Sequence, residues 1–236
     1  MKLIAFDTST ESTSVALSID GSVQLWQQET PQQHAKLLLG VIDRLLAEAG
    51  IARSALDAIA FGRGPGSFTG VRLATAVAQG LSFGLDRPAV PVSTLAALAQ
   101  ATLPQAAGRP VLALLDARMG ELYAGLYRAD PESGMALLTP EQVVAPAALS
   151  VAGTGAIGVC GGGYRVYAAQ LPESLQARLQ PVSGPGTEAP GADAIARLAV
   201  RQLARGIEEP PLPVYLRDRV ALTEAERRAA HSPAGR

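Results

Sequence analysis

The chain has 236 residues, of which 48% are hydrophobic and 17% charged, and its formal net charge is -1. This length is long for one simple core and short for two full domains, so it predicts one large domain or two compact lobes. The nearly balanced charge provides no overall basic surface of the kind that nucleic-acid-binding proteins use. An RNA partner would therefore have to be held by another component.

The cysteine and histidine content restricts the chemistry further. Cys160 is the single cysteine and cannot form an internal disulfide, which favours a reducing compartment. His34 and His231 are far apart in the sequence, so no local histidine motif for a metal exists. The start of the chain lacks the pattern of a signal peptide, and no apolar run approaches the ~20 residues that span a bilayer. We expect a cytoplasmic protein without a metal site.

Alternating apolar and polar residues predict three short strands at the start of the chain, over residues 3–6, 14–19 and 23–26. Asp20-Gly21 separates the second strand from the third, and this dipeptide is a strong signal for a hairpin turn. The chain is therefore expected to open with three strands that are joined by short turns.

Two helices and a glycine-rich segment follow. Apolar residues at helical spacing predict an amphipathic helix over residues 34–49, and a strand over 56–61 leads into GRGPGSFTGVR at 62–72. The second helix, over 71–83, carries small residues at every fourth position: Ala76, Gly80 and Gly84. Such a face lets another helix backbone approach closely. The pattern leaves open whether this face packs on the chain's own sheet or on a partner.

The second half of the chain follows a similar plan. Strands are predicted over residues 111–115, 121–127 and 157–160, then a helix over 189–203 and a last short strand over 214–216. The repeat predicts an α/β protein of two lobes, each a mixed sheet flanked by helices. We assign residues 1–105 to the N-terminal lobe, residues 106–219 to the C-terminal lobe, and residues 220–236 to a mobile tail.

The glycine-rich segment does not fit the common phosphate or nucleophile motifs. A P-loop needs a lysine and a hydroxyl residue after its last glycine, but Gly70 is followed by Val71 and Arg72. A nucleophile elbow needs glycines two residues before and after its serine, and Ser67 lacks this spacing. We expect no catalytic residue in this segment.

The first turn of the chain is similar to a different phosphate loop. Asp7, Thr8 and Ser9 follow the first strand, as in the first phosphate loop of the actin, sugar-kinase and heat-shock ATPase superfamily. Gly161 and Gly162 resemble the turn that contacts adenosine in that superfamily. Thr8 and Ser9 stand where a glycine is usual, and Asp116 in the second half also lacks its following glycine. These residues are therefore interpreted as a vestigial nucleotide-binding site.

Three segments together are similar to the TsaB family, also called YeaZ: DTSTESTSVAL at 7–17, GRGPGSFTGVR at 62–72 and PVYLR at 213–217. TsaB proteins are degenerate paralogues of the tRNA threonylcarbamoyl transferase TsaD, within the actin-like superfamily. The resemblance implies an actin-like fold and a cytoplasmic accessory subunit that dimerises with TsaD. With TsaE, such subunits support threonylcarbamoylation of the adenosine 3′ of the anticodon in tRNAs that read codons starting with A. The resemblance also implies that the chain contacts tRNA only as part of this complex.

The residues themselves agree with a role outside catalysis. TsaD holds its metal with a histidine pair one helical turn apart, whereas here His34 is followed four residues later by Leu38, which cannot ligate a metal. We therefore expect no catalytic residue, no metal and no required cofactor, with ATP or ADP binding left open. The alternative is an actin-like enzyme that acts alone and binds or hydrolyses ATP through Asp7, Thr8, Ser9, Gly161 and Gly162.

An accessory subunit needs an exposed surface for its partner. We expect the helices over 34–49 and 71–83 to pack against TsaD as a bundle, and the same surface to support a homodimer when TsaD is absent. The expected interface residues are His34, Leu38, Ile42, Leu45, Arg72, Ala76, Val77, Gly80 and Leu81.

Overall fold

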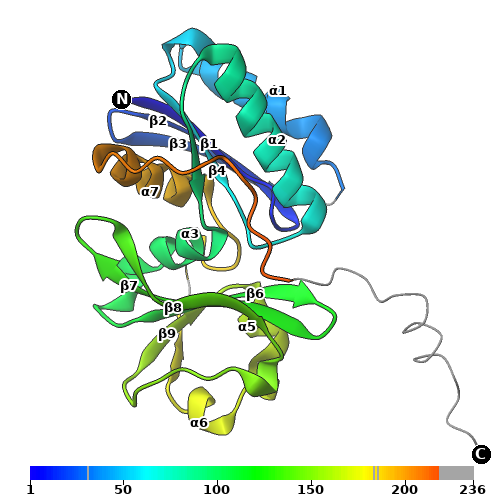
Figure 1. Cartoon of the computed structure of the whole chain (residues 1–236), viewed down its shortest axis with the longest axis vertical. Helices are drawn as coiled ribbons and strands as arrows, with labels where there is room; N and C mark the ends of the chain where they lie inside the picture. Colours follow the sequence, from blue (N-terminus) through cyan, green and yellow to red (C-terminus); the bar gives the residue numbers. More distant parts are fainter. Residues whose placement is uncertain (31, 183, 185, 218–236) are drawn as a thin grey trace, which may run out of the picture.

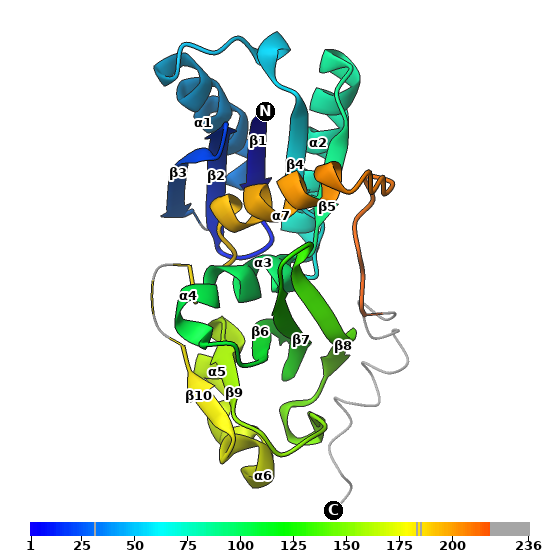
Figure 2. The ribbon, with the colours of Figure 1, turned by 90° about the vertical axis from the view of Figure 1, so that its left-hand side faces the viewer.

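The computed structural model describes residues 1–30, 32–182, 184 and 186–217, which form two lobes that each contain one five-stranded sheet (Figures 1 and 2). The first sheet contains β1 Lys2–Asp7, β2 Ser12–Ile19, β3 Ser22–Glu29, β4 Ala58–Gly62 and β5 Ala89–Val92. The second contains β6 Val111–Arg118, β7 Glu121–Asp130, β8 Gly134–Val144, β9 Ile157–Cys160 and β10 Leu179–Pro181.

The two sheets have the same topology. The first has the order β3-β2-β1-β4-β5, and the second has the equivalent order β8-β7-β6-β9-β10. In each, the first three strands form an antiparallel meander and the last two run parallel to the first strand. This repeat gives the two-lobed α/β plan of the actin-like fold, as predicted.

The helices cover both faces of the first sheet. The chain forms α1 His34–Glu48, α2 Phe68–Leu85, α3 Thr94–Ala101, α4 Leu103–Ala106, α5 Gly162–Tyr167, α6 Glu173–Gln176 and α7 Ala192–Ala204, with short 3-10 turns at Arg53–Ala55, Pro146–Ala148 and Ala168–Gln170. Successive residues of β1 point to opposite faces, so Ile4 and Phe6 pack under α1 and α2, while Leu3 and Ala5 face α7. Because both faces are buried, the strand is a continuous apolar run.

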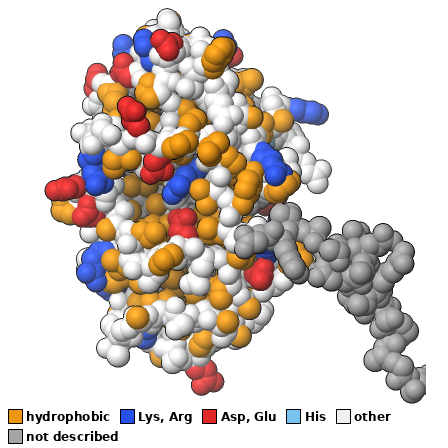
Figure 3. Space-filling model, viewed as in Figure 1, with side chains coloured by type: hydrophobic (Ala, Val, Ile, Leu, Met, Phe, Trp, Pro, Cys, Tyr) orange, Lys and Arg blue, Asp and Glu red, His pale blue; other side chains and the backbone are white. Residues whose placement is uncertain are grey.

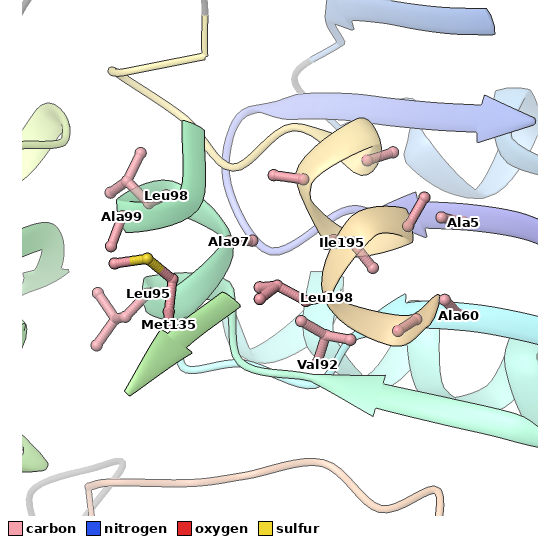
Figure 4. Packing of buried hydrophobic residues seen from close by; sticks show 14 of the residues in the cluster. Ala5, Ala60, Val92, Leu95, Ala97, Leu98, Ala99, Met135, Ile195 and Leu198 are labelled. Carbon is pink, nitrogen blue, oxygen red and sulfur yellow. The ribbon is translucent and has the colours of Figure 1, made fainter. Parts of the chain in front are cut away.

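Two helices exchange places between the lobes. α3 follows the first sheet in sequence but packs on β6 and β7, whereas α7 follows the second sheet but packs on β1, β2, β4 and β5. They meet in one buried cluster that includes Leu95, Leu98, Met135, Ile195 and Leu198 (Figure 4). A shared apolar core therefore joins the two lobes on this side.

Most of the predicted elements are confirmed. The hairpin turn is present, with positive φ at Asp20 and Gly21, and both long helices form. The strand predicted over residues 214–216 is wrong: this segment is extended, but it has no place in a sheet. The lobe boundary at residues 105 and 106 stays a prediction, and the predicted tail over 220–236 lies outside the described residues. Among the described helices, none is long and apolar enough to cross a membrane.

Candidate functional site

A cavity of about 600 Å³ lies between the two lobes. Its walls come from the β1–β2 loop, the start of α2, the end of β6, the start of α5, and the segment that follows α7. The residues lining it include Ser9, Phe68, Asp116, Tyr123, Gly162 and Tyr215. On the face shown in Figure 3, acidic and basic side chains are interspersed with apolar ones. Two of the residues predicted for a vestigial nucleotide site, Ser9 and Gly162, lie in its wall.

Asp7 ends β1, and its carboxylate is buried away from this cavity. The backbone N–H and the hydroxyl of Ser9 donate to Asp7 Oδ1 at 2.9 and 2.7 Å. Oδ2 is buried against Gly62 and has no hydrogen-bond partner among the described residues. Burial raises the pKa of Asp7 to about 6, although the bonds from Ser9 act in the opposite direction. In the described structure this carboxylate is enclosed by the protein and does not line the cavity.

Other polar groups of the first loop also form hydrogen bonds within the chain. Thr8 donates its hydroxyl hydrogen to the Gly70 carbonyl at 2.7 Å, and Ser67 donates its backbone N–H to the Ser9 carbonyl at 2.7 Å. A magnesium nucleotide needs free amides, hydroxyls and an accessible carboxylate at this loop. In the described structure the Thr8 hydroxyl and the Ser9 amide and hydroxyl are instead bonded within the chain. The described residues also contain no group of three or more His, Cys, Asp or Glu side chains that could hold a metal.

In the second half of the predicted nucleotide site, some residues make contacts within the chain and one lines the cavity. Asp116 Oδ1 accepts from the Arg118 backbone N–H at 2.7 Å and from the Tyr167 hydroxyl at 3.1 Å. Gly161 has φ +101°, and a side chain there would overlap the Leu114 carbonyl, so this glycine is required by close packing. Gly162 begins α5 and does line the cavity. Of the five predicted nucleotide residues, Ser9 and Gly162 face the cavity, whereas Asp7, Thr8 and Gly161 do not.

The glycine-rich segment packs directly on the first loop. A Cβ at Gly70 would overlap the Thr8 carbonyl oxygen, so only glycine permits α2 to start this close to β1. Together with the two hydrogen bonds above, this contact fixes the first turn of α2 against the sheet. The segment therefore determines where α2 begins and how it is oriented.

Three of the predicted interface residues lie inside the protein. Leu38, Ile42 and Leu45 are 1%, 2% and 3% exposed, and they pack in the core with Ile4 and Phe6. The apolar face of α1 covers the chain's own sheet, because an amphipathic helix buries that face first. These three side chains hold α1 in place and are not available as partner contacts on the chain as described.

The other predicted residues of the second helix are accessible to different degrees. Arg72, Ala76 and Gly80 are exposed, whereas Val77 and Leu81 are half-buried against the core. Among the atoms that the structure describes, none beyond the local helix backbone lies within 4 Å of a Cβ built at Gly80 or Gly84. The small-residue face of α2 therefore does not pack on the chain's own sheet.

Two exposed apolar side chains, one on each long helix, were not predicted. Leu39 on α1 is 51% exposed and Phe83 on α2 is 93% exposed, and a Cβ at Gly40 would also meet open space in the described structure. Phe83 lies on the side of α2 opposite the buried residues of that helix, and this position is the signal that could have identified it, whereas Leu39 lies at the edge of the buried stripe of α1. We define the docking face as Ala76, Gly80, Phe83 and Gly84 on α2, the helix that packs beside α1 (Figure 1).

His34 begins α1 and connects it to the sheet. Its Nδ1 lies 2.6 Å from the Thr13 hydroxyl oxygen and 3.3 Å from that of Thr30. Partial burial lowers the pKa of His34, against a smaller raising effect of Glu11. The side chain is therefore an inward-facing contact between the start of α1 and the first sheet.

The comparisons with known proteins agree with this architecture. The family model described as TsaD, tRNA N6-adenosine threonylcarbamoyltransferase, matches residues 27–222. The chain is 41% identical to the structure of YeaZ from Pseudomonas aeruginosa, with a TM-score of 0.82 over 91% of this chain and 99% of that one. It is 47% identical over 123 residues to the tRNA threonylcarbamoyladenosine biosynthesis protein TsaB of Haemophilus influenzae, covering 52% of each chain.

A second curated relative, the TsaB protein of Escherichia coli, is 41% identical over 150 residues, which cover 61% of this chain and 64% of the relative. These two sequence matches thus span about half to nearly two thirds of the curated relatives. The fold and the family match together define the class, a two-lobed actin-like protein of the TsaD family. Within that class, the chain belongs to the TsaB group, also called YeaZ.

Proposed function

We propose that this chain is a non-catalytic subunit of the machinery that forms threonylcarbamoyladenosine in tRNA. It binds the transferase TsaD directly and acts with TsaE, and a separate enzyme supplies the threonylcarbamoyl adenylate donor. TsaD transfers the group to the adenosine 3′ of the anticodon in tRNAs that read codons starting with A. The similarity to the TsaB proteins of Haemophilus influenzae and Escherichia coli supports a role in this biosynthesis.

The observation that carries the partner assignment is the open docking face. Each glycine inside a helix costs about 0.8 to 1 kcal/mol relative to alanine. α2 contains Gly80 and Gly84, where a built Cβ meets no described atom within 4 Å beyond the local helix backbone, and Phe83 beside them is 93% exposed. Such a cost is offset when a second helix backbone approaches closely and covers the neighbouring apolar side chains. We infer that the partner helices belong to TsaD, or to a second copy of the chain when TsaD is absent.

The internal hydrogen bonds of the first loop favour this role over an enzyme that hydrolyses ATP alone. Asp7 is buried, and the Ser9 amide and the Thr8 hydroxyl are bonded within the chain. Titration calorimetry of the purified chain with magnesium and ATP tests the alternative. We expect no heat of binding, and saturable binding with turnover would support the enzyme instead.

Co-elution with TsaD tests the proposal itself. Val77 is half-buried beside the docking face, and a glutamate there would place a charge in the contact without a partner, which costs several kcal/mol. We expect Val77→Glu to elute separately from TsaD while the wild-type chain co-elutes. Co-elution of a folded Val77→Glu variant would contradict the assignment of this face.

A further inference from the structure

The motif PVYLR at residues 213–217 is not used by the docking face, and the structure gives it a different set of contacts. The chain leaves α7 at Ala204, runs along the first lobe, and reaches the second lobe at Arg217 (Figures 1 and 2, orange to red). Gln79 on α2 donates its side-chain amide to the Pro211 carbonyl at 2.7 Å, and the Val214 backbone N–H donates to the Arg63 carbonyl at 2.8 Å. These bonds fix the segment to the first lobe.

Tyr215 attaches the segment to the start of α2. The rings of Tyr215 and Phe68 lie 6.0 Å apart between centroids, and the Arg72 guanidinium lies 3.2 Å from the Phe68 centroid and 5.2 Å from that of Tyr215. Aromatic pairs at this spacing, with a cation over one face, stabilise each other. The segment therefore follows the first lobe if the two lobes move apart.

Arg217 makes the contact with the second lobe. Its Nη2 forms an ion pair with Glu121 at the start of β7 and donates to the Arg118 carbonyl at 3.3 Å, and its Nη1 lies 3.2 Å from the Met119 sulfur. One guanidinium thus holds three groups of the tight turn that joins β6 and β7. The Arg217 side chain is 15% exposed, so solvent screens this ion pair less than an exposed one.

A second ion pair joins the first lobe to the same turn. Glu11, in the β1–β2 loop, lies 2.5 Å from Arg118, and the two side chains are well exposed. Both contacts lie along the cavity between the lobes, whose walls include Glu11, Arg118, Met119, Tyr215 and Arg217. The apolar cluster of α3 and α7 joins the lobes elsewhere, so the cavity wall at the turn is held by few and mainly polar contacts.

We propose that residues 213–217 are a latch that closes the cavity between the lobes, with Arg217 as the side chain that locks it. While Arg217 is paired with Glu121, the β6–β7 turn is fixed to the first lobe, and Ala117 on the cavity wall is buried. Loss of the pair releases the turn, because the remaining contact between Glu11 and Arg118 is exposed and weak. The inference uses contacts within this chain and is independent of the partner that the docking face binds.

A single cysteine on the cavity wall measures this opening. Ala117 lines the cavity and is buried, so Ala117→Cys provides a reporter thiol, while the native Cys160 is buried in β9 and should stay unreactive. We expect Arg217→Ala to raise the rate of thiol modification at position 117 about tenfold, which corresponds to about 1.4 kcal/mol in the opening equilibrium. The matched control is Arg197→Ala, which removes an ion pair with Asp193 inside α7 and should leave the rate unchanged.

A second variant removes the other half of the lock. Glu121→Gln should also raise the rate, though by less than Arg217→Ala, because Arg217 keeps its contacts with the Arg118 carbonyl and Met119. The double variant should be no faster than Arg217→Ala alone, since that variant has already lost the pair. Circular dichroism establishes that each variant is folded. An unchanged rate in either folded single variant, or additive effects in the double variant, would overturn the latch.

Discussion

Replacement of Gly80 should change the stability of the isolated chain and its binding to TsaD in opposite directions. Gly80 lies inside α2 at a helical position without positive φ, and a Cβ there meets no described atom within 4 Å. Leucine is a better helix former than glycine by about 0.5 to 0.8 kcal/mol, so Gly80→Leu should stabilise the isolated chain by that amount. For a protein of this size, the gain corresponds to a rise in Tm of about 1 to 3 °C.

The same substitution should have the opposite effect on binding. A leucine side chain on the small-residue face keeps the two helix backbones apart and removes the contacts around Phe83, which is exposed in the chain alone. We expect Gly80→Leu to weaken binding to TsaD by at least about 2 kcal/mol, or about thirtyfold in Kd. A gain in stability together with a loss of binding cannot come from misfolding.

The measurement needs thermal unfolding of the chain alone and calorimetric titration with TsaD. Ala204→Leu is the matched control, because Ala204 is exposed on α7, away from α2. It should leave the Kd for TsaD unchanged. The reasoning is refuted if Gly80→Leu binds TsaD as tightly as the wild type, or if it lowers the Tm of the isolated chain.

The remaining predictions concern stability, each measured by urea unfolding. Gly70→Ala should destabilise the chain by at least about 2 kcal/mol, since its Cβ overlaps the Thr8 carbonyl, and a neutral effect would contradict that contact. Leu38→Ala should cost about 2 to 5 kcal/mol and Leu39→Ala less than about 0.5 kcal/mol, because only Leu38 is buried; equal losses would place both in the core. Asp7 has its pKa raised from 3.8 to about 6, so the folded state holds a proton that the unfolded state has lost between these values. The free energy of unfolding should therefore fall by up to about 3 kcal/mol as pH rises from 3.8 to about 6. Asp7→Asn should remove this fall, and the same pH dependence in both proteins would contradict the role given to Asp7.

The elements with clear periodicity could be predicted from the sequence. β1 and β2 alternate or run apolar, and α1 has one broad apolar face, so their existence followed from spacing alone. β8 was not predicted because Pro140 and two register shifts against β7 obscure its alternation. α3 was not predicted because it is buried between the lobes and its own residues are small or apolar on nearly all sides. The sequence therefore shows no amphipathic pattern there.

The candidate site could be predicted only in part, for a similar reason. Helical spacing identified Leu38, Ile42 and Leu45 as one face, but spacing does not say whether that face covers the chain's own sheet or a partner. The first loop has the residue types of a phosphate site, yet its donors are bonded within the chain. Val214-Tyr215-Leu216 alternates like a strand, although its neighbours are a loop carbonyl and an aromatic ring. In each case the pattern identified the residues correctly but not the groups that they contact. Those contacts are made with residues distant in sequence, so spacing alone does not predict them.

Reconstituted tRNA modification tests the central claim most directly. Purified TsaD, TsaE, the donor-forming enzyme and an unmodified tRNA that reads codons starting with A are combined with or without this chain, and threonylcarbamoyladenosine is measured by mass spectrometry. We expect modification when both this chain and TsaD are present, and none when either is omitted. Full modification without this chain, or modification by this chain without TsaD, would contradict the assignment of a non-catalytic subunit.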